Sequence, residues 1–532
     1  GDEPQLTGRE GALTLHLPPL SGGIWQEAQA AADALRAAGL LLHPTSLPTP
    51  YGTGTLGPVA YEFVDFLAAA GQKIWQILPL APVRDDGSPY ASPSAFAGDP
   101  RLIAPYWLGE WGWLKEEELL PLSANPLPEG AAVHEELLHL AWTRFCAAPS
   151  KAYEVFCKRE SAWLEDYALY EATRQCEKGR PWYEWPAELR HRVPEALAAQ
   201  RHRVCREMDY IKFQQYCFAR QWAALRRHAK SRGITLLGDM PLFLALDSAD
   251  VWQYPTLFQL NEDGSPRKVA GVPPDYFSAE GQLWGNPQYD WEAHEKTGYR
   301  WWIDRFRHAL TRVDRLRLDH FRGLAAYWEI DGGAKTAVEG RWVKGPGDAF
   351  FAALRQALGD LPFVAEDLGV LSDEVKALRE TWGFPGMKVL QFELFGNGTP
   401  RLGAAFSENT VAYTGTHDND TTQGWLDRAS EHERAFVSGY LSRAVPGVQL
   451  KDEQLCSALI SAAFFSVAAF AVIPMQDLFA LGSEARMNMP STSGETNWAW
   501  RMNADFFDGE KARYLKHLSR LSGRNVKENL AK

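Results

Sequence analysis

The strongest constraint on the fold is an alternation of short apolar runs with segments of helical periodicity. Eight such runs occur, at 39–47, 73–80, 233–243, 314–323, 362–369, 386–394, 409–418 and 470–479. Helical spacing of apolar residues lies between most of them, as at 59–71, 298–313, 348–359 and 372–383. Alternating strands and helices favour a parallel sheet. Eight repeats predict an α/β fold, a closed (β/α)8 TIM barrel, rather than an open sheet.

Polar side chains gather where these runs end. They are His43, Asp239, Arg317, Asp319, Glu366, Asp367, Glu393, His417, Asp418, Gln476 and Asp477. In a (β/α)8 barrel the active site lies at the carboxyl ends of the strands. The sequence therefore predicts an active site with several acidic groups on one rim. In the fourth run, Asp319 is flanked by Arg317 and Arg322, and such arginines keep a carboxylate ionised at neutral pH.

The spacing of the runs also predicts the domain organisation. Residues 1–37 form an N-terminal appendage, and 38–532 form the catalytic barrel. A mainly helical insertion at about 81–232 separates strands two and three, and a lid or substrate loop at about 244–297 separates strands three and four. Long loops rich in proline, glycine and aromatic residues usually bind ligands or cover sites.

Charge and hydropathy exclude several classes of function. The net charge is −12, from 55 basic and 67 acidic residues, so a nucleic-acid partner is not expected. No run of 18 apolar residues is present, so no membrane span is expected. The segment 457–474 comes closest, and its serines and final proline predict a buried helix that leads into a strand.

The six cysteines include no CxxC pair, which favours free thiols in a reducing compartment. The N-terminus shows no secretory signal, so the expected location is cytoplasmic, or the plastid stroma if a transit peptide has been removed. Aromatic residues make up 12% of the chain. Rings outside the core suit a ligand with flat apolar faces and a polar rim, such as a sugar.

A pair of carboxylates on neighbouring strands is the first chemical hypothesis. Asp319 ends strand four and Glu366 ends strand five, and adjacent strands lie ~4.8 Å apart. Carboxyl groups ~5–5.5 Å apart are typical of retaining glycosidases, in which one attacks the anomeric carbon and the other donates a proton. Asp418 on strand seven could stabilise the positive charge that develops. Arg317 would keep Asp319 ionised, whereas burial and nearby anions would raise the pKa of Glu366.

Three alternatives remain open at this point. A metal hydrolase has candidate ligands in His43, Asp239, His320, His417, Asp418 and Asp477, but the usual HxH and HExxH spacings are absent. The glycines of GTGTLG at 52–57 fit a nucleotide-binding pattern, although Pro48 and Pro50 separate them from the preceding strand. A non-catalytic carbohydrate-binding protein would explain the aromatic residues but not three acids aimed at one point.

Several motifs resemble those of the amylomaltases, also called disproportionating enzymes or 4-α-glucanotransferases, of the α-amylase superfamily. The resemblance extends from about 39 to 501. It rests on the segments LLHPTSLP, WQILPL, GSPYASPSAFAGDP, GDMP, PPDYFSAEGQLWGNPQYDW, RLDHFRG, AEDLG, GTHDND and RMNMPST…NWAWR. The long PPDYFSAEGQLWGNP segment is the most specific of them, because related amylases lack it.

The resemblance implies a role for each of thirteen residues. Asp319 is the expected nucleophile, Glu366 the general acid/base and Asp418 the transition-state stabiliser. The expected substrate-binding residues are Arg317, His320, His417, Tyr90, Ser88, Asp239, Gln282, Trp284, Asn286 and Asn488. Arg317 is the partner of the nucleophile, and Tyr90 stacks on the sugar before the cleaved bond.

The implied reaction moves a segment of α-1,4-glucan to the 4-hydroxyl of glucose or of another glucan, with cyclisation possible for long chains. An α-1,4-glucan hydrolase of the same superfamily is the alternative. Both half-reactions are carboxylate and proton chemistry, so no metal and no organic cofactor are expected. The expected partners are maltooligosaccharides, amylose, and fragments of starch or glycogen, with glucose as acceptor. The sequence leaves the oligomeric state open.

Overall fold

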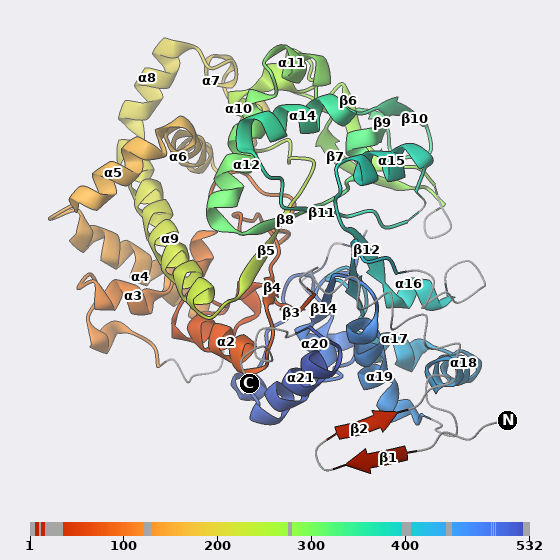
Figure 1. The fold of residues 1–532 in the computed structure, drawn as a ribbon. Helices are drawn as coiled ribbons and strands as arrows, with labels where there is room; N and C mark the ends of the chain where they lie inside the picture. Colours follow the sequence, from red (N-terminus) through yellow and green to blue (C-terminus); the bar gives the residue numbers. More distant parts are fainter. Residues whose placement is uncertain are drawn as a thin grey trace.

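The computed structural model contains the predicted barrel. It describes residues 6–9, 12–15, 36–121, 127, 129–274, 279–369, 371–395, 406–442, 450–490, 492, 494 and 496–524. Eight parallel strands form one sheet in the order β11-β8-β5-β4-β3-β14-β13-β12. The backbone N–H of Ala365 at the end of β11 donates to the carbonyl of Pro385, just before β12, at 2.8 Å, which brings the two ends of the sheet together. The predicted (β/α)8 fold is confirmed (Figure 1).

Seven of the eight predicted runs contain one barrel strand, and the first, 39–47, overlaps a strand that begins two residues earlier. The strands are β3 (Ala37–Leu41), β4 (Ile74–Gln76), β5 (Thr235–Met240), β8 (Arg315–Leu318), β11 (Phe363–Ala365), β12 (Gly386–Val389), β13 (Thr410–Tyr413) and β14 (Phe470–Pro474). They are shorter than the runs, because the chain turns where polar residues begin. The sixth run becomes helix α16 (Leu390–Phe395) and the eighth becomes α20 (Met475–Leu478). Glu393 therefore lies in a helix and not at a strand end.

Inward-facing side chains fill the barrel, as expected for a packed core rather than a pore. Leu41, Ile74, Leu237, Met387 and Val472 belong to one buried apolar cluster inside the sheet. Around the sheet lie helices α2 (Pro58–Ala69), α12 (Arg300–Arg312), α14 (Gly347–Leu358), α15 (Asp373–Thr381), α17 (Thr422–Arg428), α18 (Glu431–Ser442), α19 (Asp452–Phe465) and α21 (Gly509–Leu521). The segment 457–474 is a helix followed by a strand, as predicted, but the helix is buried along one face only.

Between β4 and β5 the chain is mainly helical. The helices are α3 (Pro105–Glu110), α4 (Gly130–Phe145), α5 (Lys151–Arg159), α6 (Ser161–Cys176), α7 (Ala187–Arg190), α8 (Pro194–Arg203) and α9 (Cys205–Ser231). The long helix α9 packs against α6, α5 and α4, and also against α2 of the barrel. In Figure 1 these helices form one side of the molecule.

The segment between β5 and β8 differs from the predicted loop. After α10 (Ala249–Gln253), its strands β6 (Lys268–Val272) and β7 (Gln282–Pro287) join β9 (Ala326–Asp331) and β10 (Gly340–Lys344), with α11 (Trp291–Lys296) following β7. The four strands form an antiparallel sheet in the order β10-β9-β6-β7. We call it the lid sheet. No local pattern in the sequence indicated this sheet, because β6 and β7 precede barrel strand β8 in the chain, whereas β9 and β10 follow it, after the short helix α13 (Arg322–Ala325).

The remaining described elements add little to the site. Strands β1 (Leu6–Arg9) and β2 (Ala12–Leu15) pair with each other in antiparallel register. Within the described ranges, no helix has both the length and the apolar character needed to cross a membrane. The glycine pattern at 52–57 has a packing reason, because a Cβ on Gly54 would overlap the carbonyl oxygen of Pro44.

Close contact between β3 and β4 predicts opposite effects for two glycine substitutions. A Cβ on Gly39 would overlap the backbone of Ile74, its partner on β4, whereas nothing lies within 4 Å of a Cβ on Gly439 in α18. Gly39→Ala should lower the free energy of unfolding by about 1–3 kcal/mol through overpacking. Gly439→Ala should raise it by up to about 1 kcal/mol, because alanine is the better helix former. Urea unfolding of both variants measures the difference, and a neutral Gly39→Ala would contradict the tight strand pairing.

Candidate active site

Strand register places Asp319 beside Glu366. Leu318 of β8 pairs with Ala365 of β11, and each acid follows its strand by one residue. The backbone N–H of Glu366 donates to the carbonyl of Leu318 at 3.0 Å, and that of Asp319 donates to the carbonyl of Met240 on β5 at 3.0 Å. Ladder hydrogen bonds therefore hold both residues at the carboxyl rim of the barrel.

Arg317 joins Asp319 to a second carboxylate inside the barrel. Arg317 and Asp239 are register partners on β8 and β5. The Arg317 Nη1 donates to Asp239 Oδ1 and Oδ2 at 2.9 and 2.8 Å, and to Asp319 Oδ1 at 2.9 Å. Burial opposes the charge of Arg317, but the two acids outweigh it and raise its pKa. Burial raises the pKa of Asp239, an effect that Arg317 opposes.

Glu366 lies in a setting that favours its neutral form. Its Oε2 accepts from the backbone N–H of His320 at 2.9 Å, and its Oε1 accepts from that of Leu368 at 3.1 Å. Burial raises the pKa of Glu366 to about 7; Arg317 lowers it and the negative charge of Asp319 raises it. Glu366 is therefore poised to exchange a proton near neutral pH.

Asp418 follows β13 and is fixed by polar partners. Asn488 Nδ2 donates to Asp418 Oδ1 at 2.7 Å, and His417 Nε2 lies 3.3 Å from Asp418 Oδ2. Arg486 Nη2 donates to the backbone carbonyl of Asp418 at 2.6 Å. The Asp418 side chain remains 44% exposed, so it is open to a bound molecule.

The Tyr90 hydroxyl connects His417 with Asp239, the carboxylate that pairs with Arg317. This hydroxyl lies 2.7 Å from Asp239 Oδ2 and 2.9 Å from His417 Nε2. The Tyr90 ring is nearly parallel to that of His417, with ring centres 5.3 Å apart. Burial and the charge of Asp239 raise the pKa of Tyr90, which keeps the phenol neutral. Ser88 Oγ accepts from the backbone N–H of Tyr90 at 3.3 Å and so belongs to the same turn.

The lid sheet contributes an aromatic wall beside His320. The rings of Trp284 and His320 meet edge to face, with centres 4.8 Å apart, and Phe243 contacts both. Gln282 Oε1 accepts from Trp284 Nε1 at 3.1 Å, and Asn286 Nδ2 donates to the carbonyl of Leu244 at 2.7 Å. Burial lowers the pKa of His320 to about 4, so its ring is neutral.

Three other acids of the predicted runs do not join this cluster. Asp367 accepts from the backbone N–H of Met387 and pairs with Arg379, and Asp477 accepts from Thr414 and Thr422. Glu393 lies on α16 with its carboxylate 3.6 Å from Lys388. Within the described part of the chain, no three His, Cys, Asp or Glu side chains form a group that could hold a metal ion.

Three further residues, which the sequence did not indicate as site residues, shape the site. The Trp498 ring lies 5.7 Å from that of Tyr90 and 5.9 Å from that of His417, and its backbone is left-handed with φ 63°. Phe243 and Arg486 also contact site residues. The NWAWR motif contains Trp498, but only the fold brings it to Tyr90.

A barrel with a carboxylate pair on adjacent strands and a third acid nearby defines an enzyme that acts on glycosidic bonds. Comparisons with known proteins agree. The family model described as 4-alpha-glucanotransferase, glycosyl hydrolase family 77, matches residues 42–506. The 4-alpha-glucanotransferases of Aquifex aeolicus and Thermus thermophilus are 45% and 47% identical, covering 92% and 88% of this chain and 100% and 95% of those proteins.

A solved structure gives the same result. The amylomaltase from Streptococcus agalactiae, in complex with acarbose, is 35% identical and superposes with a TM-score of 0.86, covering 92% of this chain and 99% of that one. The chain belongs to the 4-alpha-glucanotransferase family, and the resemblance predicted from its motifs is confirmed. It is an enzyme of the retaining transferase type, which argues against a metal hydrolase, a nucleotide-binding protein or a non-catalytic sugar-binding protein.

The buried Arg317–Asp239 pair predicts a strong coupling in stability. Arg317→Met should lower the free energy of unfolding by about 3–5 kcal/mol, because it leaves a buried carboxylate without its guanidinium. The double variant Arg317→Met/Asp239→Asn should recover at least half of that loss. Arg307→Met, in an exposed pair with Asp304, should change stability by less than about 1 kcal/mol. Additive effects of the two buried substitutions would contradict the coupling.

Proposed function

We propose that this enzyme moves segments of α-1,4-glucan from a donor chain to the 4-hydroxyl of glucose or of another glucan. The observation that supports it best is the pairing of Asp319, held by Arg317, with Glu366, whose pKa is raised to about 7 mainly by burial. One carboxylate is thereby suited to attack and the other to donate a proton. Their placement on adjacent strands, ~4.8 Å apart, agrees with a retaining double displacement.

In the first half-reaction Asp319 is the nucleophile and Glu366 the general acid. Asp319 forms a bond to the anomeric carbon while the bond from that carbon to the glycosidic oxygen breaks. The proton of Glu366 goes to this oxygen, which leaves as the 4-hydroxyl of the departing sugar. Asp418 faces the positive charge that develops on the sugar ring, and the hydrogen bond that Asn488 donates fixes the orientation of the Asp418 carboxylate.

In the second half-reaction Glu366 acts as a base. It removes the proton from the 4-hydroxyl of an acceptor sugar, whose oxygen attacks the anomeric carbon as the bond to Asp319 breaks. The two inversions leave the α configuration unchanged. When glucose is the acceptor, the product is the transferred segment lengthened by one glucose unit. When the 4-hydroxyl at the far end of the bound segment itself attacks, the product is a cyclic glucan.

The lid sheet supports transfer over hydrolysis. Gln282, Trp284 and Asn286 lie on β7, and Trp284 contacts His320, next to the nucleophile in sequence. An acceptor stacked on Trp284 is held in place, and effective molarities of positioned groups reach ~10⁵ M or more, compared with ~55 M for water. We assign these three residues to the acceptor side of the bond.

The other predicted binding residues are assigned around the same sugar. We propose that Tyr90, supported by Ser88, stacks on the donor sugar before the cleaved bond, and that His320 and His417 donate to its hydroxyls. Asp239 acts through Tyr90 and Arg317, because its side chain is fully buried and both oxygens accept hydrogen bonds.

The substrate range and the compartment are also proposals. The expected donors are maltooligosaccharides and starch-type or glycogen-type glucans. All six cysteines are free thiols, which supports a reducing compartment, the cytosol first and the plastid stroma as alternative.

The product profile distinguishes transferase from hydrolase. Incubation with maltotriose should give glucose and a ladder of longer oligomers, with reducing ends constant, because each transfer forms one bond for each one broken. Chromatography of the products and a reducing-sugar assay measure both. Asp319→Ala should reduce the rate by at least about 10³-fold, as loss of a nucleophile does. A steady rise in reducing ends would indicate the hydrolase, and a loss below tenfold would exclude Asp319 as nucleophile.

The raised pKa of Glu366 predicts the pH dependence. The general acid must be protonated, and with a pKa of about 7 its protonated fraction falls tenfold per pH unit above that value. We therefore expect kcat/KM for maltotriose to decline above about pH 7. Glu366→Gln should lower the rate by about 10²–10⁴-fold. With a glucosyl fluoride donor, whose leaving group needs no proton, formation of the covalent intermediate by this variant should no longer depend on pH in that range. If formation of the intermediate by Glu366→Gln still declined above about pH 7 with this donor, the group responsible for the decline would not be Glu366.

A further inference from the structure

Hydrogen bonds join the turn that carries Asp418 to the segment 486–488, which follows β14. Asn488 Nδ2 donates to Asp418 Oδ1 at 2.7 Å, and the backbone N–H of Asn488 donates to the carbonyl of His417 at 3.1 Å. Arg486 adds two further bonds from its guanidinium. Its Nη2 donates to the backbone carbonyl of Asp418 at 2.6 Å, and its Nε donates to that of Asn488 at 2.6 Å. Arg486 therefore contacts both members of the Asp418–Asn488 pair.

The two bonds of Arg486 come from one edge of its guanidinium. The Nε–H and one N–H of Nη2 point the same way from this edge, so the planar group binds two acceptors side by side. Here the acceptors are the backbone carbonyls of Asp418 and Asn488. The guanidinium thereby fixes the backbones of these two residues relative to each other, in addition to the side-chain bond between them. A lysine ammonium is a point charge on a flexible chain and does not hold two acceptors in this way.

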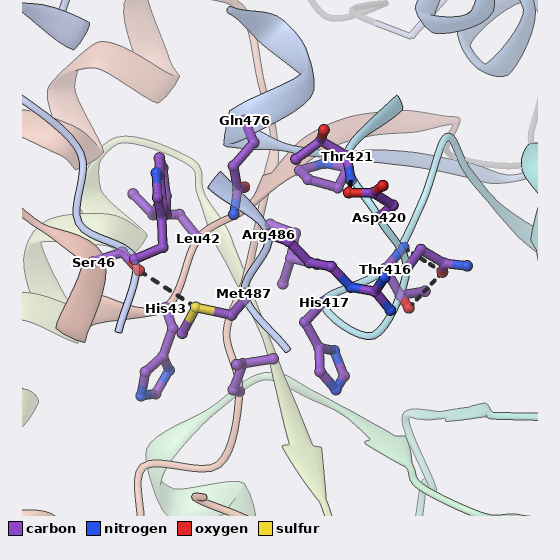
Figure 2. Close-up of a pocket in the computed structure, with 15 residues that line it drawn as sticks. Leu42, His43, Ser46, Thr416, His417, Asp420, Thr421, Gln476, Arg486 and Met487 are labelled. Carbon is purple, nitrogen blue, oxygen red and sulfur yellow. Dashed lines mark hydrogen bonds between the residues drawn. The ribbon is translucent and has the colours of Figure 1, made fainter. Parts of the chain in front are cut away.

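The turn 416–421 borders a cavity, so close packing does not support it on that side. The cavity has a volume of about 420 Å³, and its lining includes Thr416, His417, Asn419, Asp420, Thr421 and Arg486. Figure 2 shows the Arg486 side chain extended toward Thr416. Groups that face a void lose contacts on that side, so the position of the turn depends more strongly on its hydrogen bonds.

Asp420, the other acid of this turn, has partners of its own. Its carboxylate accepts from Ser483 Oγ at 2.8 Å and from the backbone N–H of Thr421 at 2.9 Å, and it forms an ion pair with Arg428. The hydrogen bonds of Arg486 go instead to the two backbone carbonyls. An arginine side chain stays protonated in proteins, and such charge-assisted hydrogen bonds are about twice as strong as neutral ones. These carbonyls, and not an ion pair with Asp420, therefore hold the guanidinium of Arg486.

We propose that Arg486 is a positioning residue that fixes the carboxylate of Asp418 for its role in the transition state. Arg486 acts directly on the backbone of Asp418, and it acts indirectly by holding Asn488, which bonds the carboxylate itself. Because the Asp418 side chain is 44% exposed, without these contacts it is free to turn toward solvent. The inference deepens the proposed function and rests on it, since it takes Asp418 as the group that stabilises the developing positive charge.

Two substitutions of Arg486 separate its charge from its geometry. Arg486→Met should lower kcat for maltotriose by about 10–100-fold with KM changed less than about threefold, because a displacement of about 1 Å in a site costs up to about 10²-fold. Arg486→Lys keeps the charge but loses the edge that binds two acceptors, so its kcat should also fall by at least about fivefold. Thermal unfolding verifies that each variant is folded, and Arg486→Lys decides the inference if Arg486→Met does not fold.

Arg226 on α9 offers a matched control at the opposite end of the barrel. Its guanidinium also donates to two backbone carbonyls, those of Thr311 and Val313, just before β8. Arg226→Met should keep kcat within about twofold of the wild type, because these carbonyls lie at the amino end of the strand and the site lies at its carboxyl end. A loss of stability alone is thereby separated from a displaced carboxylate.

A double-variant cycle measures whether Arg486 acts through the Asp418–Asn488 pair. Asn488→Ala removes the side-chain bond to Asp418 and should lower kcat on its own. If both residues hold the same carboxylate, the loss in Arg486→Met/Asn488→Ala should be at least about fivefold smaller than the product of the two single losses. A purely structural role of Arg486 predicts losses in kcat that multiply.

Three outcomes would overturn the inference. Losses that multiply in the double variant would show that Arg486 does not act through Asp418. A wild-type kcat in Arg486→Lys would show that the charge suffices without the two-acceptor edge. A rise in KM with unchanged kcat in Arg486→Met would show that Arg486 serves substrate binding instead. The rate is measured as glucose released from maltotriose, which transfer and hydrolysis both produce, so an enzyme that only hydrolysed would refute the proposed function while the cycle still decided this inference.

Discussion

The site depends on one buried guanidinium that two carboxylates share. Arg317 bonds Asp239 on the neighbouring strand and Asp319 two residues along its own strand. Alternate residues of a strand face the same side, so this spacing directs both Arg317 and Asp319 toward the barrel axis. A charge at this depth is tolerated only when its partners satisfy it. Inside the barrel, the carboxylate of Asp239 neutralises the charge of Arg317. Asp319 is held by the same guanidinium at the rim, where its side chain is still 29% exposed.

The three acids of the site differ mainly in how they are solvated and bonded. The Glu366 carboxylate is partly buried and, among the described residues, accepts from two backbone N–H groups, and desolvation is the largest cause of its raised pKa. The Asp319 carboxylate accepts a hydrogen bond from the Arg317 guanidinium, whereas the Asp418 carboxylate accepts one from Asn488 and is in contact with solvent. Three carboxylates of similar intrinsic acidity can thereby take an attacking, a proton-transferring and a charge-stabilising role, since the environment sets each one's protonation.

Two layers of structure supply these environments. The barrel strands fix Asp239, Arg317, Asp319 and Glu366 by ladder hydrogen bonds, which leaves little freedom in their positions. The surrounding residues come from connections outside the barrel. Tyr90 follows β4, Trp284 belongs to the lid sheet, and Asn488 and Trp498 come from the segment after β14. The proposed attack and proton transfer thus depend on residues held by the barrel strands, whereas binding of the glucan is assigned to the connections.

The sequence by itself determined the eight barrel strands, the helices between several of them and the barrel, because strand and helix periodicity are local properties of the chain. It also placed Asp319, Glu366 and Asp418 on one rim. Only the tertiary structure decided which strand-end acids converge. Glu366 and Asp367 are adjacent, yet Glu366 meets the His320 backbone in the site and Asp367 binds Arg379 outside it, since neighbouring side chains leave a strand on opposite sides.

Contacts between distant segments had no local pattern to reveal them. The partner of Arg317 inside the barrel is Asp239, 78 residues earlier, and Arg322, expected beside Asp319, has its guanidinium over the ring of Trp342. The lid sheet joins two strands that precede β8 in the chain with two that follow it, and Tyr90 contacts His417, 327 residues later in the chain. Such pairings depend on which surfaces meet when the barrel closes, and periodicity in the chain does not encode that choice.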